Sequence, residues 1–159
     1  MQNQLPTLQQ VLLESKFGCT ENKIDMFTGP KQLKYKKTRK GKLNKLEFKN
    51  NRLVFGEVGL KAAESGLITA RQIESARQAI TRKLKRKGKI WIKFFPDIPV
   101  TSKPTGVRLG KGKGQFSHWA ARVRGGTMLF EIAGSNLNMI LLALKTGGAK
   151  LPIKTKVVV

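Results

Sequence analysis

The clearest periodic pattern in the chain predicts an α-helix that begins at Thr69 and stops at Gly88. Thr69 and Gln72 have the spacing of a capping box, in which the threonine oxygen accepts a hydrogen bond from the amide of the third helical residue. Apolar residues then recur at intervals of three, four and four, which places Ile73, Ala76, Ile80 and Leu84 in one stripe. The stripe predicts a helix with a single face against a core.

Short runs rich in strand-forming residues alternate with this helical pattern and predict strands over residues 53–60, 90–95, 116–123 and 128–133. Residues 124–127 contain two glycines and predict the turn between the last two strands. A second, almost wholly apolar helix is predicted over residues 136–146, with Gly147 and Gly148 as its stop. Strands and two helices without regular βαβ repeats predict an α+β fold, with a mixed, mainly antiparallel sheet and both helices on one face.

The segment 96–116 joins two predicted strands but is far longer than an ordinary hairpin connection. It contains three prolines, four glycines and four cations. Glycine lets a backbone approach another surface closely, proline limits the entropy lost on ordering, and cations bind phosphate. We therefore predict a long basic loop over residues 97–115 that lies against nucleic acid.

The chain contains 32 lysines and arginines but only 9 acids, which gives it a net charge of +23. Residues 1–29 carry two lysines and three acids, so residues 30–159 hold 30 cations and 6 acids. This shift predicts an N-terminal extension over 1–29 and a basic domain over 30–159. Such a charge predicts a polyanionic partner, with nucleic acid as the first candidate and an anionic membrane surface as the other.

The domain begins with a run that has eight cations and no acid between residues 30 and 45. A charge run is often only a solvated, mobile face. Here Leu33, Tyr35 and Leu43 are interleaved with the cations, which favours a basic arm over residues 30–50 that becomes ordered on RNA.

The residues give little indication of nucleotide binding, metal binding or acid–base catalysis. The glycine–lysine run 110–114 lacks the spacing of a P-loop or a dinucleotide fingerprint, so no nucleotide cofactor is predicted. His118 is the only histidine and Cys19 the only cysteine, so we predict no metal site, no internal disulfide and a reducing compartment. The few acids offer no obvious pair for acid–base catalysis. Trp91 and Trp119 are interpreted as core residues, with base stacking as the alternative.

Several stretches, in order along the chain, resemble one family: residues 67–77, 85–93, 95–97, 103–104, 108–114 and 150–155. They are similar to the large-subunit ribosomal protein called L sixteen in bacteria, whose archaeal and eukaryotic counterpart is called L ten. The chain departs from the family pattern in its first 29 residues, at Phe94 and Leu109, and at Gly147–Gly148, which we expect to shorten the last helix.

The resemblance implies a structural, non-enzymatic protein near the base of the central protuberance of the large ribosomal subunit. Its partners would be large-subunit rRNA, neighbouring ribosomal proteins and tRNA in the aminoacyl and peptidyl region. Arg108 would occupy the position where some bacterial members carry a hydroxylated arginine. The predicted rRNA-binding residues are Lys31, Lys34, Lys36, Lys37, Arg39 and Lys40 of the arm, and Arg71, Arg82, Lys83, Arg86 and Lys87 of the first helix. The predicted tRNA-facing residues of the loop are Lys103, Arg108, Lys111 and Lys113.

A free basic RNA chaperone and a membrane-surface protein are the alternatives. A membrane binder should place aromatic residues opposite lysines on an amphipathic helix, and the 69–87 segment contains no aromatic residue. Abundant lysine, asparagine and isoleucine without a visible import signal lead us to expect an organelle ribosome in the mitochondrial matrix, with a plastid or a bacterial cytoplasm as alternatives.

Overall fold

The computed structural model describes residues 29–32, 34, 35 and 37–159, so most of the predicted extension, as well as Leu33 and Lys36 of the arm, lies outside the described residues. The elements are, in chain order, β1 (Val58–Ala62), β2 (Gly66–Thr69), α2 (Ala70–Lys83), β3 (Lys89–Ile92), β4 (Ile98–Ser102), β5 (Gln115–Val123), β6 (Met128–Ala133), α3 (Leu137–Gly148) and β7 (Thr155–Val158).

The strands form two sheets rather than the single sheet predicted, and every pairing is antiparallel. One sheet has the order β3-β6-β1-β7 and the other the order β2-β5-β4. A turn does close at residues 124–127, where the Thr127 amide donates to the Arg124 carbonyl at 3.2 Å. The strands on either side of it do not pair with each other, because the turn carries the chain from one sheet to the next. The α+β class is confirmed.

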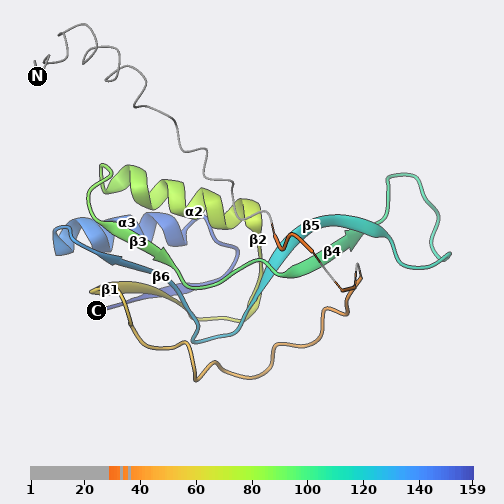
Figure 1. Cartoon of the computed structure of the whole chain (residues 1–159), viewed down its shortest axis with the longest axis horizontal. Coiled ribbons are helices and arrows are strands. Elements are labelled where there is room, and N and C mark those ends of the chain that lie inside the picture. Colours follow the sequence, from red (N-terminus) through yellow and green to blue (C-terminus); the bar gives the residue numbers. More distant parts are fainter. Residues whose placement is uncertain (1–28, 33, 36) are drawn as a thin grey trace, which may run out of the picture.

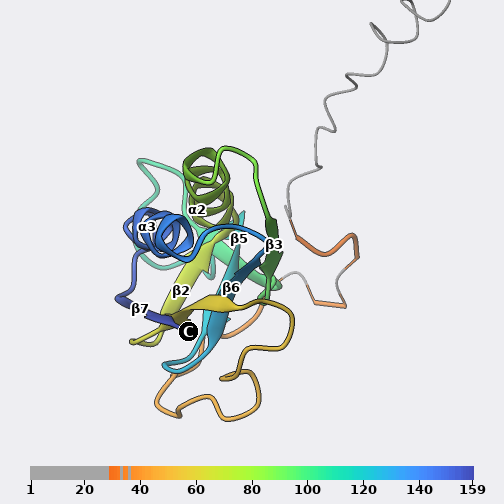
Figure 2. The ribbon, with the colours of Figure 1, turned by 90° about the vertical axis from the view of Figure 1, so that its left-hand side faces the viewer.

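Both helices lie on the same side of the strands, as predicted (Figures 1 and 2). α2 and α3 pack against each other, while α3 contacts β1 and β7 and α2 contacts β2 and β5. The predicted apolar stripe of α2 is fully buried, together with inward residues of the four-stranded sheet such as Leu60 and Phe130. Helix periodicity thus identified the face that closes the core.

The start of α2 agrees with the sequence prediction, but its end does not. The Gln72 amide donates to the Thr69 hydroxyl at 3.3 Å, and the Thr69 amide donates to the Gln72 side chain at 2.9 Å, which completes the capping box. The helix ends at Lys83, before the predicted stop at Gly88. Leu84 is the last apolar residue of the stripe, so a further turn would bury only cations.

The two glycines predicted to stop α3 instead form its last turn, so the helix is not shortened. Gly147 is buried against α2, where a Cβ atom would lie 2.5 Å from Cγ1 of Ile80. At Gly148 a Cβ atom would lie 2.5 Å from the hydroxyl oxygen of Thr155. These glycines therefore serve the close approach of packed elements, which a local sequence pattern does not reveal.

We expect Gly147→Ala to lower the free energy of unfolding by about 1–3 kcal/mol, the usual cost of overpacking a filled core. Combining it with Ile80→Ala should give a loss smaller than the sum of the two single losses, because the smaller side chain makes room for the new methyl group. Urea unfolding of the single and double variants measures this coupling. Strictly additive losses would contradict the close packing of Gly147 on Ile80.

Two segments differ from the strands and loop that were predicted. The chain over residues 53–56 is not part of β1, because the amides of Val54, Phe55 and Gly56 all donate to the Glu131 carboxylate instead of to a strand. β4 lies inside the predicted loop and pairs with β5, which leaves only residues 103–114 as the connection. β4 is an edge strand of its sheet, where a proline such as Pro99 costs no ladder hydrogen bond.

Candidate nucleic-acid interface

The basic loop 103–114 extends beyond the β4–β5 hairpin, away from the helices and the four-stranded sheet (Figure 1). The ammonium group of Lys103 donates to the Gly110 carbonyl at 2.6 Å and closes the loop on itself. Gly110 and Gly112 have φ angles of 88° and 87°, and a side chain at either position would meet no other atom. Glycine is therefore favoured at these two positions by the backbone conformation and not by close packing.

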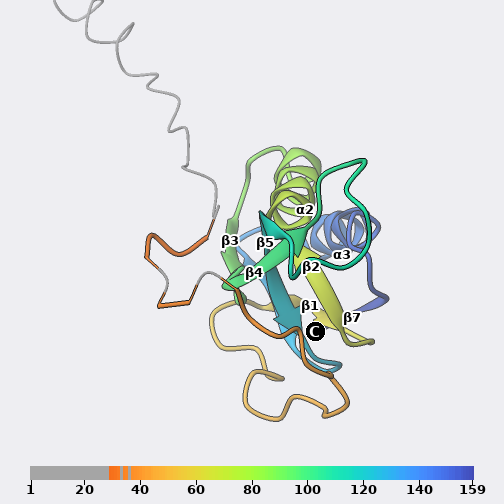
Figure 3. The ribbon, with the colours of Figure 1, turned by 90° about the vertical axis from the view of Figure 1, so that its right-hand side faces the viewer.

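The arm runs along the side of the sheets opposite the helices (Figures 2 and 3). The Lys37 ammonium group donates to the Lys113 carbonyl at 3.0 Å, and the Lys113 ammonium group donates to the Thr38 carbonyl at 2.5 Å. The Arg122 guanidinium donates to the Arg39 carbonyl at 3.2 Å. We call this place, formed by Lys37, Thr38, Arg39, Lys113 and Arg122, the arm–loop junction.

Further contacts fix the course of the arm toward β1. The Glu47 amide donates to the Gly125 carbonyl at 3.0 Å, and the Met128 amide donates to the Asn50 carbonyl at 2.8 Å. The Asn50 side chain in turn donates to the Met128 carbonyl at 3.3 Å. The domain itself therefore positions the arm from Lys37 onward.

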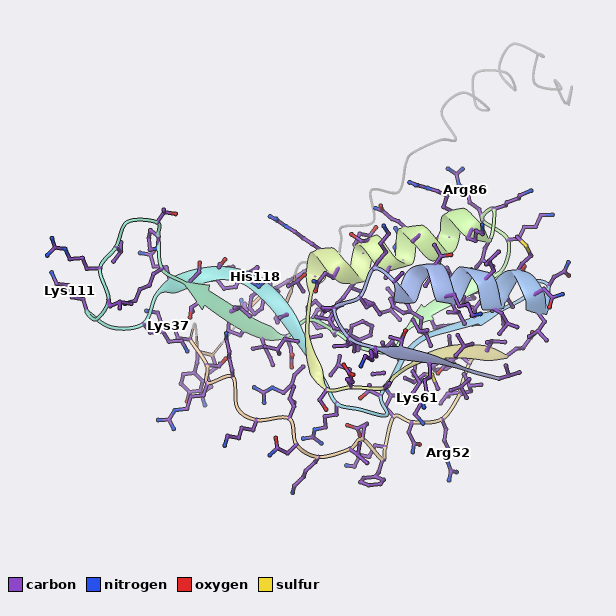
Figure 4. The ribbon with its side chains drawn as sticks, turned by 180° about the vertical axis from the view of Figure 1, so that it is seen from behind. Lys37, Arg52, Lys61, Arg86, Lys111 and His118 are labelled. Carbon is purple, nitrogen blue, oxygen red and sulfur yellow. The ribbon has the colours of Figure 1, made fainter. Side chains whose placement is uncertain are left out.

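The helix cations divide into two places. Arg71 stands in the first turn of α2 beside β5. The other four lie at or just beyond the end of α2, and we call Arg82, Lys83, Arg86 and Lys87 the helix cluster. Arg86 and Lys111 lie at opposite ends of the long axis of the molecule (Figure 4). Apart from Arg71, the predicted cations thus form two separate groups, which are the helix cluster and the cations of the arm and loop.

All the predicted cations that the structure describes are exposed, and none of them forms an ion pair with an acid in the described part of the chain. The acids that do form ion pairs bind other cations. Their pairs are Glu74 with Arg77 at 2.6 Å, Glu64 with Lys154 at 2.9 Å, Glu131 with Lys93 at 3.4 Å and Glu47 with Arg124 at 3.8 Å. The positive charge of the arm, loop and helix cluster is left for an external anion.

Arg77 illustrates this division of roles, because it lies on α2 between predicted RNA-binding residues. Its guanidinium makes two hydrogen bonds to the Glu74 carboxylate, at 2.6 and 2.9 Å. These hydrogen bonds hold the pKa of Glu74 below its usual value, although partial burial acts in the opposite direction. Arg77 is thereby neutralised within the helix and is a weak candidate for binding phosphate.

The predicted core role of the two tryptophans is wrong. Trp91 is only partly buried, lies outside the core cluster and stacks on the exposed ring of Phe55 at a centroid distance of 6.0 Å. Trp119 is also partly buried and contacts Phe116 at 4.9 Å. On β3 it is Ile90 and Ile92 that pack against the core, so the period-two alternation of a strand turns Trp91 outward.

Arg122 is a candidate residue that the sequence analysis missed. It is exposed between the buried Ala121 and Val123 of β5 and forms part of the arm–loop junction. The alternation of a small residue, an arginine and a valine was a usable signal for an outward-facing cation on a strand.

Within the described ranges, no group of three or more His, Cys, Asp or Glu side chains is placed to hold a metal ion. The helices of that same part of the chain include none that is long and apolar enough to span a membrane.

The fold and the exposed positive charge define a basic α+β protein with an extended surface for a polyanion. The sequence pattern of the family described as ribosomal protein L16p/L10e matches residues 30–158. Relatives named large ribosomal subunit protein uL16 include those of Acidiphilium cryptum and Parvibaculum lavamentivorans, each 54% identical over 129 residues, which cover 81% of this chain and 94% and 93% of those proteins. The relative from Rhizobium meliloti is 51% identical over the same length, with 81% and 94% covered. The chain belongs to the ribosomal protein L16p/L10e family.

Proposed function

We propose that this protein is a structural, non-enzymatic component of the large ribosomal subunit and binds large-subunit rRNA. Family membership over residues 30–158 is the observation that carries the proposal. The structure supports it with two groups of exposed cations that no described acid neutralises. Such cations bind phosphates and release condensed counterions, which makes binding strongly dependent on salt.

The arm–loop junction and the helix cluster suit different parts of a large RNA, because they lie at opposite ends of the molecule (Figure 4). One continuous phosphate ridge would have to follow the whole long axis to meet both. A folded rRNA can instead present two helices, one at each end. The protein would then fix the position of the two rRNA helices relative to each other.

The loop is the part of the chain that we assign to tRNA in the aminoacyl and peptidyl region. Lys103, Arg108, Lys111 and Lys113 are exposed along it, and the side chain of Leu109 is 96% exposed at its far end. Its base is held by two hydrogen bonds, one from the Lys37 ammonium group to the Lys113 carbonyl and one from the Lys113 ammonium group to the Thr38 carbonyl. A projecting loop with a braced base can reach a ligand that the rest of the domain does not touch.

We expect Arg108→Ala to leave the fold unchanged, since Arg108 is exposed, but to slow tRNA accommodation or large-subunit maturation. Subunit profiles and translation rates in cells that depend on the variant measure both effects. Lys154→Ala is the matched control, because Lys154 is an exposed cation outside both groups. Normal profiles and normal translation with Arg108→Ala would count against the role of the loop.

A free RNA chaperone, the alternative considered from the sequence, would exchange between RNAs rather than remain with one particle. The compartment is a separate proposal. The relatives described above are bacterial proteins, and we retain the mitochondrial matrix as the expected compartment, with the plastid and the bacterial cytoplasm as alternatives. Fractionation of the source cells, with detection of the chain in each organelle, tests it.

A further inference from the structure

A cavity of about 590 Å³ lies between the first turn of α2 and β5, and its lining includes Arg71, Phe116, His118 and Trp119. It exists because β2 pairs with β5 only from Gly66 to Thr69, after which the chain turns away into α2. From Gln115 to Trp119, the edge of β5 that faces away from β4 has no partner among the described strands. Backbone donors and acceptors of this edge are therefore free to bind a ligand beside the cavity.

A β-bulge gives the cavity its aromatic wall. Val100 pairs with His118 and Thr101 with Phe116, so Ser117 is an extra residue in β5. In a regular strand, residues three apart point to opposite faces, but one extra residue brings them to the same face. The rings of Phe116 and Trp119 accordingly meet at a centroid distance of 4.9 Å and an angle of 54°.

The charge of the cavity selects between possible occupants. Arg71 is exposed in the lining and forms no ion pair with a described acid, and the described residues that line the cavity include no acid. The side chain of Phe116 is 47% exposed, which is costly for a ring unless something covers it. An apolar peptide would cover the rings but would leave the arginine without a partner. A nucleotide would both cover the exposed ring and give the arginine a partner, because its base stacks on aromatic rings and its phosphate binds arginine.

We propose that this cavity binds one unstacked nucleotide of an RNA, with its base stacked on the exposed ring of Phe116, next to Trp119, and its phosphate at Arg71. One face of the Trp119 ring is already packed against Gly29, so Phe116 is the ring that is left for the base. The inference rests on the proposed function, since it assumes that RNA is the partner. It adds a site that reads an exposed base to the cations that bind phosphates. The lining residues of β5 follow directly after the basic loop in the chain.

The test compares two probes on the full chain: a single-stranded RNA octamer of uridines, and the same octamer without its internal bases. Both probes carry the same phosphates, so the ratio of their dissociation constants measures what the bases contribute to the affinity. Trp91→Phe serves as the background, so that fluorescence reports Trp119 alone. We expect the complete octamer to bind about tenfold more tightly and to quench Trp119, which is the usual effect of one base–aromatic stack.

Phe116→Leu should reduce this ratio to about one while large-subunit rRNA still binds with a steep salt dependence. Phe48→Leu is the matched control, because Phe48 is 78% exposed on the arm and distant in sequence from the cavity. Circular dichroism checks that both variants fold. A ratio near one in the Trp91→Phe background, or a ratio that Phe116→Leu leaves unchanged, would overturn the nucleotide site. Failure of large-subunit rRNA itself to bind would contradict the proposed function instead. Loss of the base preference and loss of rRNA binding are therefore distinguishable outcomes.

Discussion

Glu131→Ala is expected to lower the free energy of unfolding by about 3–5 kcal/mol, which is typical when one partner of a buried ion pair is removed. Glu131 is fully buried on β6. One of its oxygens accepts hydrogen bonds from the amides of Val54, Phe55 and Gly56 at 3.2, 2.7 and 3.0 Å. The other lies 3.4 Å from the Lys93 ammonium group. Removing the carboxylate therefore leaves three amides and one cation without their acceptor.

The matched control is Glu64→Ala, which also removes one acid from an ion pair. Glu64 and Lys154 are both exposed, so we expect a loss below about 1 kcal/mol. Urea unfolding of the full chain, followed by circular dichroism, measures both variants. Equal losses in the two variants would show that the buried carboxylate does not hold residues 54–56 against β6.

The same carboxylate predicts a pH dependence. Burial raises the pKa of Glu131, but the three amide donors and Lys93 outweigh it and leave the pKa below its usual value. A group with a depressed folded pKa contributes its full stability above its unfolded pKa of about 4.3 and loses it as the pH falls through the folded value. The difference in stability between the wild type and Glu131→Gln should therefore narrow below about pH 4. A difference that stays constant down to pH 2 would contradict this assignment.

The second large effect is expected on RNA binding. Replacing the four residues of the helix cluster with glutamine should reduce the slope of log affinity against log salt by about three, because each phosphate contact contributes about 0.7–0.9. The control replaces four exposed lysines outside both groups, Lys145, Lys150, Lys154 and Lys156, and loses the same net charge. Titration of large-subunit rRNA at several salt concentrations measures the slopes. Equal changes in both variants would mean that net charge, rather than the helix cluster, drives binding.

Local patterns in the sequence predicted the parts of the fold that depend on neighbouring residues. The stripe from Ile73 to Leu84 and the capping box at Thr69 need only a few residues to be recognised, and both are confirmed. The turn at residues 124–127 was also located correctly. Its role was not, because which strands pair depends on contacts made far along the chain.

The errors share a physical cause, which is interaction across long sequence separation. Residues 53–56 resemble a strand, but their amides bind Glu131, more than 70 residues away. Gly147 resembles a helix stop, but it packs on Ile80 of another helix. The arm–loop junction was missed for the same reason, because its hydrogen bonds join residues more than 70 positions apart. The exposed loop and cation runs were easier to recognise, because no core requirement explains so many glycines and lysines together.

The proposed function requires the chain to be a permanent part of the large ribosomal subunit. Sedimentation of a native lysate through a magnesium-containing gradient, with detection of this chain in each fraction, measures whether it is. We expect the chain to migrate with large subunits and monosomes and to remain there after a high-salt wash. A chain that stays at the top of the gradient, or leaves the particle at modest salt, would contradict the claim and favour a free RNA chaperone.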